Sequence, residues 1–422
     1  MELILYLCYV ILVTFIDAKL QMSLKIKKVS KHRSLLLTSV SLGDPSQRMN
    51  VVIDINSNLT SVKTFEPKLS KNCMVVEYIE NKLNQTVDGY DVAGLHLKDH
   101  AEISNLFMHY FGFVLIYKLN SFNADLSDVN GILGLNKISD SVQPSKYLND
   151  NWDSFINYGY DMMYNERFVK IDLTGKEAYL SIGRRNDTMI DCERENRNDF
   201  YFNCFLNGIV LGNVSDSVNS MKIMKYAYFS TINQLIFCPE EDFEFIVEEF
   251  FANTINRREC YIKELHNSLN EDNVKIIMCD ALSLQKMKII NFVFSDTIAL
   301  SIEAHKLFIS ESNGEFAFGI ATKSSNSNWI FGYLIMQFIP LGFNHENRKM
   351  SFITTNITNA VTEMKTKFNF PDIKIIRTET NIRIPFIANM IIIIIALMII
   401  GGGLLYKTYK IVSSLNCNGN NV

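Results

Sequence analysis

The chain has 422 residues, of which 48% are apolar and 20% are charged. This composition supports packed domains, two or three by length, and excludes a globally disordered chain. The formal net charge of −4 gives no electrostatic reason to expect a nucleic-acid partner.

The N-terminal sequence has the pattern of a secretory signal peptide. In MELILYLCYVILVTFIDA, residues 1–18, an apolar run spans positions 3–16 and the small residue Ala18 closes the segment. The acidic Glu2 departs from the usual basic start, so an uncleaved membrane anchor is the alternative. A short basic N-terminal segment, residues 19–33, then precedes the first strand, which we expect near Leu35.

The middle of the chain has the texture of a mainly β protein. Residues 34–355 consist mostly of short β-branched and aromatic runs broken by Gly, Asn, Asp and Ser. One segment differs: PEEDFEFIVEEFFANTI, residues 239–255, has apolar residues near helical spacing, a proline at its start and acidic residues in its first turn. This segment is predicted to be a helix.

The C-terminal part predicts a single membrane span. Residues 356–383 are polar and mixed in charge, as expected of a stalk. IPFIANMIIIIIALMIIGGGLLY, residues 384–406, carries no charge and is long enough to cross the hydrocarbon core as a helix. Lys407 and Lys410 follow at once, which places the tail, residues 407–422, in the cytosol. We therefore expect a single-pass type I membrane protein with a lumenal or extracellular ectodomain.

The tail and the ectodomain carry short motifs of that pathway. YKIV, which contains Tyr409 and Val412, resembles a tyrosine-based endocytic sorting signal, a pattern that also arises by chance. Such a signal would take the protein through the endolysosomal pathway or to the cell surface. Five sequons are candidate glycosylation sites: Asn58, Asn84, Asn186, Asn213 and Asn356.

Six cysteines lie between the predicted signal peptide and the membrane span, and an even number permits three disulfides. The sequence does not choose among the possible pairings. No Cys/His spacing predicts a zinc site, and no cofactor is expected. His96 and His100 stand four residues apart without a third ligand in sight, so solvated surface histidines are the expected reading. The disulfide candidates are Cys73, Cys192, Cys204, Cys238, Cys260 and Cys279.

One pattern occurs twice at long range. VVIDINSNLTSV, which contains Asp54, and YAYFSTINQLIFCP, which contains Ser230, each consist of an apolar strand, a polar four-residue turn and a second apolar run. The two copies lie about 176 residues apart. A protein of two lobes, with one such turn in each lobe, would produce this repeat.

Four segments together resemble the pepsin-like aspartic peptidases. In chain order they are VSLGDPSQRMNVVIDINSNLTSV, VNGILGL, AYFSTINQLIFCP and WIFGYLIMQFIPLGFNHENRKMSFI. The resemblance covers residues 34–353 and implies a bilobal β fold with few short helices, with lobes at residues 34–195 and 196–355. It also implies a cleft between the lobes that takes a peptide or protein ligand. The predicted ends are similar to those of membrane-anchored family members.

The family's chemistry needs two aspartates, one in each turn, which share a proton because two adjacent carboxylates do not both ionise easily. The ionised Asp takes a proton from water while the other polarises the scissile carbonyl. In this chain the first turn keeps Asp54 and Ser57, but Ile55 stands where the family has Thr, and Asn56 stands where it has Gly. The loss of the Thr hydroxyl removes one tie between the turns, whereas Asn tolerates the left-handed backbone that Gly allows.

The second turn departs further from the family pattern. Ser230 stands where the second Asp belongs, and Ile232 stands in place of Gly, where a β-branched side chain fits poorly. Thr231 is kept, and Asn233 completes the turn. Elsewhere, Tyr78 is a candidate for the tyrosine of the family's substrate-covering flap, and Tyr333 replaces an Asp that is usually structural.

These departures predict a catalytically impaired pseudopeptidase that keeps a binding cleft. Asp54 would be the remnant of the catalytic pair, and Ser230 would mark the position of the lost member. One alternative is an active endopeptidase of the secretory or endolysosomal pathway with an atypical dyad. Another is a sorting or adhesion receptor.

Overall fold

The structure is a computed structural model, and it describes most of the residues between the two predicted hydrophobic ends. The signal peptide, the five sequon asparagines, the membrane span and the tail with Tyr409 and Val412 lie outside the described residues. Among the residues that are described, no helix is both long and apolar enough to cross a membrane. The described ranges are 20–30, 33–57, 60–83, 90–104, 106–121, 129–136, 168–183, 188–192, 202–212, 220–266, 273–280, 289–294, 298–311, 314–323, 327–354 and 361–363.

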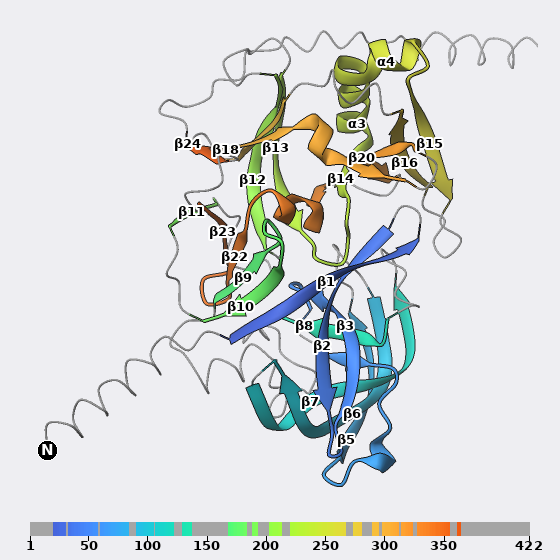
Figure 1. The fold of residues 1–422 in the computed structure, drawn as a ribbon, viewed down its shortest axis with the longest axis vertical. Helices are drawn as coiled ribbons and strands as arrows, with labels where there is room; N and C mark the ends of the chain where they lie inside the picture. The colour runs from blue at the N-terminus through green and yellow to red at the C-terminus, as the bar shows by residue number, and fades with distance from the viewer. Residues whose placement is uncertain are drawn as a thin grey trace, which may run out of the picture. The chain divides into compact units, whose positions relative to one another are not determined.

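The described residues form a mainly β protein, as predicted, built on two sheets (Figure 1). The first sheet has 13 strands in the order β11 (Met189–Asp191), β23 (Lys349–Ile353), β22 (Leu341–Asn344), β9 (Phe168–Asp172), β10 (Ala178–Ile182), β1 (Leu20–Ser30), β2 (Arg33–Leu42), β3 (Gln47–Asp54), β8 (Gly131–Gly134), β4 (Ser61–Val62), β7 (Leu106–Ser121), β6 (Tyr90–Ile103) and β5 (Met74–Leu83).

The second sheet has 11 strands. Ten follow the order β15 (Cys260–His266), β16 (Asn273–Cys279), β20 (Phe316–Lys323), β14 (Ile236–Cys238), β21 (Trp329–Phe331), β13 (Ser220–Phe229), β12 (Asn203–Leu211), β17 (Ile289–Phe294), β18 (Ile298–Glu303) and β24 (Val361–Glu363), and β19 (Phe308–Ser310) pairs with β20. Because β24 pairs with β18, residues 361–363 of the segment predicted to be a stalk belong to this sheet.

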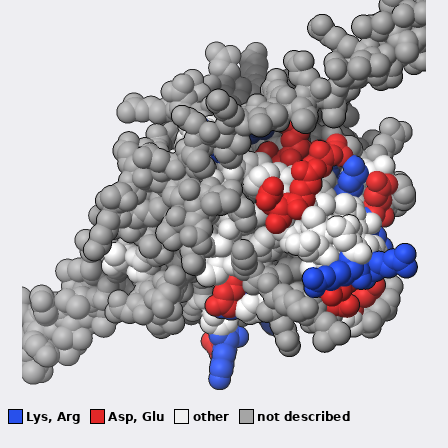
Figure 2. All heavy atoms as spheres, turned by 90° about the horizontal axis from the view of Figure 1, so that it is seen from above, with Lys and Arg blue, Asp and Glu red and all other residues white. Residues whose placement is uncertain are grey.

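The predicted helix is present but is not uniform. It runs through α3 (Glu240–Ile246), a π-helical turn η3 (Val247–Phe251) and α4 (Ala252–Asn256), and it buries Phe243, Ile246 and Phe251. Its acidic first turn carries Glu240, which pairs with Lys275 of β16. Among the described residues, the other helical pieces are the short 3-10 turns η1 (Pro67–Leu69), η5 (Ala304–Leu307) and η6 (Tyr333–Gln337). On the face drawn in Figure 2, acidic and basic side chains lie next to one another, so neither sign of charge dominates its described part.

The first strand starts at Leu20, not near Leu35 as the sequence reading expected. In its first half Leu20, Met22 and Leu24 are buried at alternate positions, the pattern of a half-buried strand. That half pairs with β10, and the second half pairs with β2, so β1 joins the two parts of the first sheet (Figure 1). Most basic residues of β1 fall in its second half. They obscure the alternation of buried residues in the first half when the sequence is considered alone. Residues 20–30 of the predicted basic segment are therefore part of the sheet.

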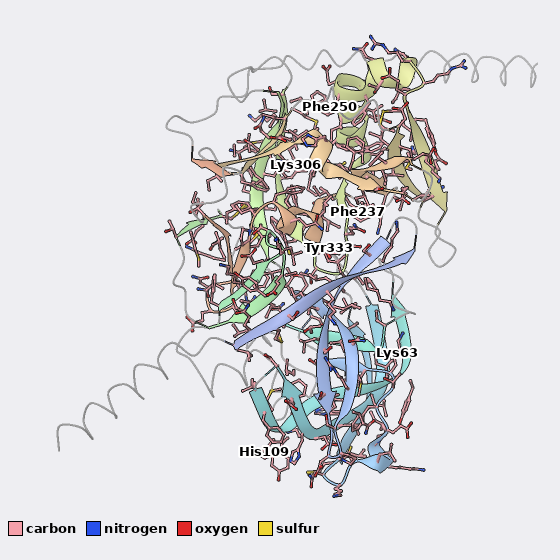
Figure 3. The ribbon with its side chains drawn as sticks, in the orientation of Figure 1. Lys63, His109, Phe237, Phe250, Lys306 and Tyr333 are labelled. Atoms are coloured by element: carbon pink, nitrogen blue, oxygen red, sulfur yellow. A yellow bond between two sulfur atoms is a disulfide. The ribbon has the colours of Figure 1, made fainter. Side chains whose placement is uncertain are left out.

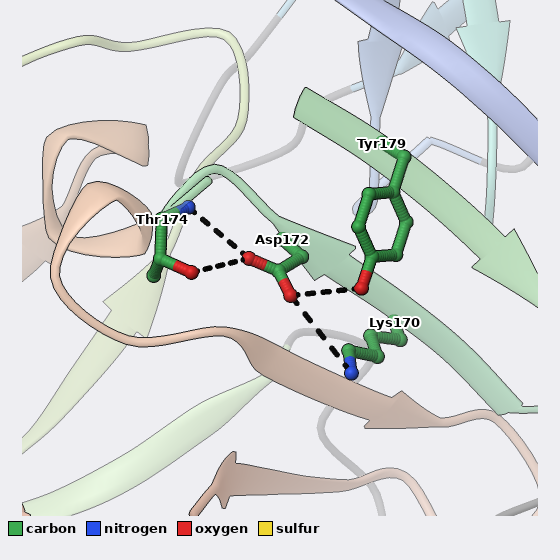
Figure 4. A network of polar contacts seen from close by, with 4 residues as sticks. All are labelled: Lys170, Asp172, Thr174 and Tyr179. Carbon is green, nitrogen blue, oxygen red and sulfur yellow. Dashed lines mark hydrogen bonds and ion pairs between the residues drawn. The ribbon is translucent and has the colours of Figure 1, made fainter. Parts of the chain in front are cut away.

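A partly buried polar network joins β9 and β10, the strands beside β1 (Figure 4). Asp172 of β9 accepts hydrogen bonds from the backbone N–H and the hydroxyl of Thr174, at 3.1 and 2.7 Å, and from the Tyr179 hydroxyl at 2.9 Å. Lys170 Nζ lies 3.9 Å from the same carboxylate. Because a buried charge is costly unless it is paired and hydrogen-bonded, these contacts are what make Asp172 and Lys170 tolerable inside the fold.

His96 lies on β6 with a fully buried side chain, so the expectation of a surface histidine was wrong. Burial, with a smaller contribution from the positive charge of Lys98, lowers the pKa of His96 from 6.5 to about 4. The unfolded chain therefore binds a proton on this histidine between those two pH values, while the folded chain does not. The contribution of neutral His96 to the free energy of unfolding is therefore fully present above about pH 6.5. It is lost as the pH falls toward about 4.

We expect the free energy of unfolding to drop by about 3 kcal/mol on this account when the pH falls from about 7 to about 4. Urea unfolding of the wild type and of His96→Gln across this range measures it. The variant should show a flatter dependence, and equal slopes for the two proteins would contradict the assignment to His96.

The strand–turn–strand repeat is confirmed, and each copy has a third strand inserted between its two strands. In the first sheet β8 lies between β3 and β4, parallel to β3 and antiparallel to β4. In the second sheet β21 lies between β13 and β14, parallel to β13 and antiparallel to β14. The same unusual arrangement thus occurs once in each sheet, around the turn that contains Asp54 and around the turn that contains Ser230.

Candidate functional site

The two repeated turns touch each other through Thr231. The Thr231 hydroxyl donates to the carbonyl oxygen of Ile53 at 2.8 Å and accepts the backbone N–H of Ile55 at 3.2 Å. Thr231 is fully buried, so both hydrogen bonds are shielded from water. The prediction that a turn hydroxyl ties the two turns together is confirmed for Thr231.

Asn56 supplies the opposite tie. Its side-chain amide Nδ2 donates to the carbonyl oxygen of Phe229 at 2.8 Å, across to the second turn. Ile55, which has no hydroxyl, offers no such donor. The expected role of Asn56 was a left-handed backbone in place of Gly, but Asn56 is not among the described non-glycine residues with positive φ. The side chain of Asn56 is what reaches the second turn, and the sequence did not predict this contact.

Asp54 lies at the end of β3 with no exposed surface. Its Oδ1 accepts the backbone N–H of Asn56 at 2.8 Å, and its backbone carbonyl accepts the N–H of Leu135 at 2.8 Å. The first turn is also held by Asn136, whose backbone N–H donates to Ser57 O at 2.8 Å and whose side chain donates to Asn56 O at 3.2 Å. Asp54 is therefore fixed in a hydrogen-bonded turn, with Ser57 buried in the same turn.

Ser230 also has no exposed surface, and its hydroxyl oxygen already accepts two hydrogen bonds. Both come from Asn233, one from the backbone N–H and one from Nδ2, each at 3.1 Å. A hydroxyl has two lone pairs and one hydrogen, so Ser230 Oγ can only donate its hydrogen to a further group. Ser230 is thus unable to take a proton from water. Because it is not a carboxylic acid, it also cannot share a proton with Asp54 as a second aspartate would.

The rest of the second turn is well packed. Ile232 is buried and does not have a positive φ, so the expectation of strain at this position was wrong. Tyr333 follows the inserted strand β21, and its backbone N–H donates to Asn233 O at 2.9 Å. The Tyr333 side chain, labelled in Figure 3, is fully buried, consistent with a structural role at this position.

The flap candidate lies on a hairpin at the end of the first sheet. Tyr78 is in β5, where it pairs with Leu95 of β6. The side chain of Tyr78 and the hairpin tip at residues 84–89 lie outside what the structure describes. The structure therefore places the strand but does not test contact between Tyr78 and a ligand.

Four of the six candidate cysteines form disulfides: Cys192 with Cys204, and Cys260 with Cys279. The expectation that six cysteines form three disulfides fails for the last two, because Cys73, just before β5, and Cys238, at the end of β14, are free thiols. Burial and the negative charge of Asp99 raise the pKa of Cys73 to about 11. Burial also raises the pKa of Cys238 well above its usual value. Both thiols stay protonated at neutral pH and are poor nucleophiles.

The chain matches no protein-family model and no curated protein. The functional reading therefore depends on the residues and the geometry of the two turns.

Proposed function

We propose that this chain is a membrane-anchored homologue of the pepsin-like aspartic peptidases that has lost peptidase activity and keeps a peptide- or protein-binding cleft between two β lobes. The inserted-strand arrangement around each turn supports the proposal, because it repeats once per sheet. The reciprocal ties of Thr231 and Asn56 support it as well. The anchor rests on the apolar run at residues 384–406 and the lysines that follow it.

The observation that carries the loss of activity is the state of Ser230. A peptidase of this type needs one group to take a proton from water and a second to polarise the scissile carbonyl. Asp54 remains for the first task, but Ser230 is a neutral hydroxyl whose acceptor sites are filled by Asn233. Losing one member of such a pair costs about 10⁴ in rate, or roughly 5–6 kcal/mol of transition-state stabilisation.

One observation favours the rival function, an active endopeptidase with an atypical dyad. Asp54 keeps the hydrogen-bonded turn that would orient a catalytic carboxylate. In this mechanism the Ser230 hydroxyl would donate to a water or to the substrate carbonyl, with Asp54 as base. A neutral hydroxyl donor is a weaker stabiliser of developing negative charge than a carboxylic acid in a matched dyad, which is why we place this function second.

The test is a cleavage assay with the full-length chain purified in detergent. We expect no cuts in a diverse peptide mixture from about pH 3.5 to about 7.5, the range in which a carboxylate base would titrate. Mass spectrometry detects the products, with Asp54→Ala and the inhibitor pepstatin as controls. Cuts that disappear in both controls would overturn the proposal. The double variant Ser230→Asp/Ile232→Gly tests the cleft, because recovered cutting requires that the binding surface is still present.

A further inference from the structure

Two histidines lie face to face on neighbouring strands of the first sheet. His100 is on β6 and His109 is on β7, and the ladder between these strands has an irregularity between Asp99 and Ala101. His100 Nε2 and His109 Nδ1 are 3.2 Å apart, with ring centroids separated by 4.9 Å. His109 is exposed and His100 is half-buried, so the pair is accessible from solvent. Figure 3 labels His109 near the end of this sheet.

Neighbouring side chains hold both rings. Phe107 packs at 5.4 Å from the His100 ring and at 4.9 Å from the His109 ring, measured between centroids. The side-chain amide of Asn72 lies 3.4 Å from His100 Nδ1, the ring nitrogen that faces away from His109. His100 is thus contacted at both nitrogens and packed on its face, so its orientation is well defined.

We propose that His100 and His109 form a binding site for a divalent transition-metal ion such as Zn²⁺, bound by His100 Nε2 and His109 Nδ1. Imidazole nitrogen is a preferred ligand for Zn²⁺, Cu²⁺ and Ni²⁺. Two Zn–N bonds of about 2.0–2.1 Å at a tetrahedral angle span about 3.3–3.4 Å between the nitrogens. The observed 3.2 Å is close to this span, so the two nitrogens can take a metal ion with little change in their separation.

The hydrogens can be arranged for metal binding without releasing a proton. Without metal, one ring nitrogen of the pair donates its hydrogen to the other. With metal, both facing nitrogens offer lone pairs, so His100 carries its hydrogen on Nδ1 and His109 carries its hydrogen on Nε2. Rotation of the Asn72 amide by about 180° then lets its oxygen accept the Nδ1 hydrogen. A hydrogen bond of this kind orients a metal-bound histidine.

Water would complete the coordination. Within the described residues, no group of three or more His, Cys, Asp or Glu side chains lies close enough to hold a metal ion. A site with two protein ligands and open positions at an exposed surface leaves room for water or for a donor from another molecule. The site belongs to the first sheet and does not depend on the proposed function of the two turns.

The experiment is calorimetric titration of the full-length chain in detergent with Zn²⁺ at neutral pH. We expect saturable binding of Zn²⁺ that is weakened at least about tenfold by His100→Gln and by His109→Gln, since each removes a ligand. Asn72→Ala should weaken binding by about tenfold, the usual effect of losing an orienting partner, and Asn72→Asp should restore it. His305→Gln is the matched control, because His305 is an exposed histidine beside Glu303 and outside the pair.

Thermal unfolding of each variant without metal shows whether it is folded. Folded His100→Gln or His109→Gln protein that binds Zn²⁺ as tightly as the wild type would overturn the proposal. No saturable binding by the wild type would overturn it too, and would leave the two rings as a hydrogen-bonded pair.

Discussion

Replacing Thr231 by Val should lower the free energy of unfolding by about 2–6 kcal/mol. Valine has nearly the shape of threonine, so the change opens no cavity. It leaves the N–H of Ile55 and the carbonyl of Ile53 without the partner that Thr231 gives them in a fully buried place. An unsatisfied buried donor or acceptor costs about 1–3 kcal/mol, and this substitution creates one of each.

Urea unfolding monitored by circular dichroism measures the effect of the Thr231 substitution. The midpoint should fall while the slope stays constant, because the surface exposed on unfolding is unchanged. Thr231→Ser is the matched control: it keeps the hydroxyl and loses one methyl group, so it should cost only about 1 kcal/mol. Equal losses for the valine and serine variants would show that packing, rather than the inter-turn hydrogen bonds, is what Thr231 contributes.

The contrast between Thr231 and Ser230 separates two requirements of this site. The ties made by Thr231 and Asn56 satisfy buried backbone groups, so the fold depends on them whether or not the protein is an enzyme. A second Asp would serve the chemistry alone, and Ser230 packs in its place with its oxygen satisfied by Asn233. If the chain has the proposed function, it has lost the reaction at position 230 and kept the architecture around it.

The elements that were predictable from sequence are those with strong local patterns. Short β-branched runs indicated the mainly β fold, and a proline followed by acidic residues and spaced aromatics indicated the helix that starts at Glu240. The repeat of the two turns was also visible, because both copies keep the same order of apolar and polar residues. The alternation of Leu20, Met22 and Leu24 was present in the sequence too, but basic neighbours masked it.

Features that depend on long-range contacts were not predictable. The amide of Asn56 finds its acceptor on Phe229, and nothing near Asn56 in the sequence indicates this partner. His100 pairs with His109 rather than with His96, because a β-strand ladder, not helical spacing, sets their distance. The cysteine pairing likewise follows from which strands are neighbours: Cys260 and Cys279 are directly opposite on β15 and β16.

Gly332→Ala should have the largest effect on folding, a loss above about 4–5 kcal/mol that leaves little folded protein. Gly332 directly follows β21, the strand inserted beside the second turn. A Cβ at this position would lie 2.3 Å from the carbonyl oxygen of Leu235 and 2.5 Å from that of Gln234. Both are backbone atoms, so neither can swing aside as a flexible side chain would.

Backbone movement at Gly332 would break hydrogen bonds that define the turn. The N–H of Tyr333 donates to Asn233 O at 2.9 Å, and the N–H of Leu334 donates to Gln234 O at 3.1 Å. Shifting the chain to make room for a methyl group therefore removes contacts to Asn233 and Gln234, which follow Ser230 in the second turn. The cost comes from close approach of two backbones, one of the few situations that only glycine satisfies.

Gly175→Ala is the matched control for this prediction, because the nearest atom to its added Cβ is 3.6 Å away, an ordinary contact. We expect that variant to stay within about 0.5 kcal/mol of the wild type, as surface substitutions do. The yield of folded full-length protein and its thermal midpoint compare the two. A Gly332→Ala protein with a midpoint near that of the wild type would mean that β21 and the second turn are not packed as closely as the structure has them. Position 230 holds Ser without disturbing the turn, whereas we expect the turn not to tolerate Ala at position 332. This contrast would mean that the second turn is constrained by the packing of its backbone rather than by the need for a catalytic group.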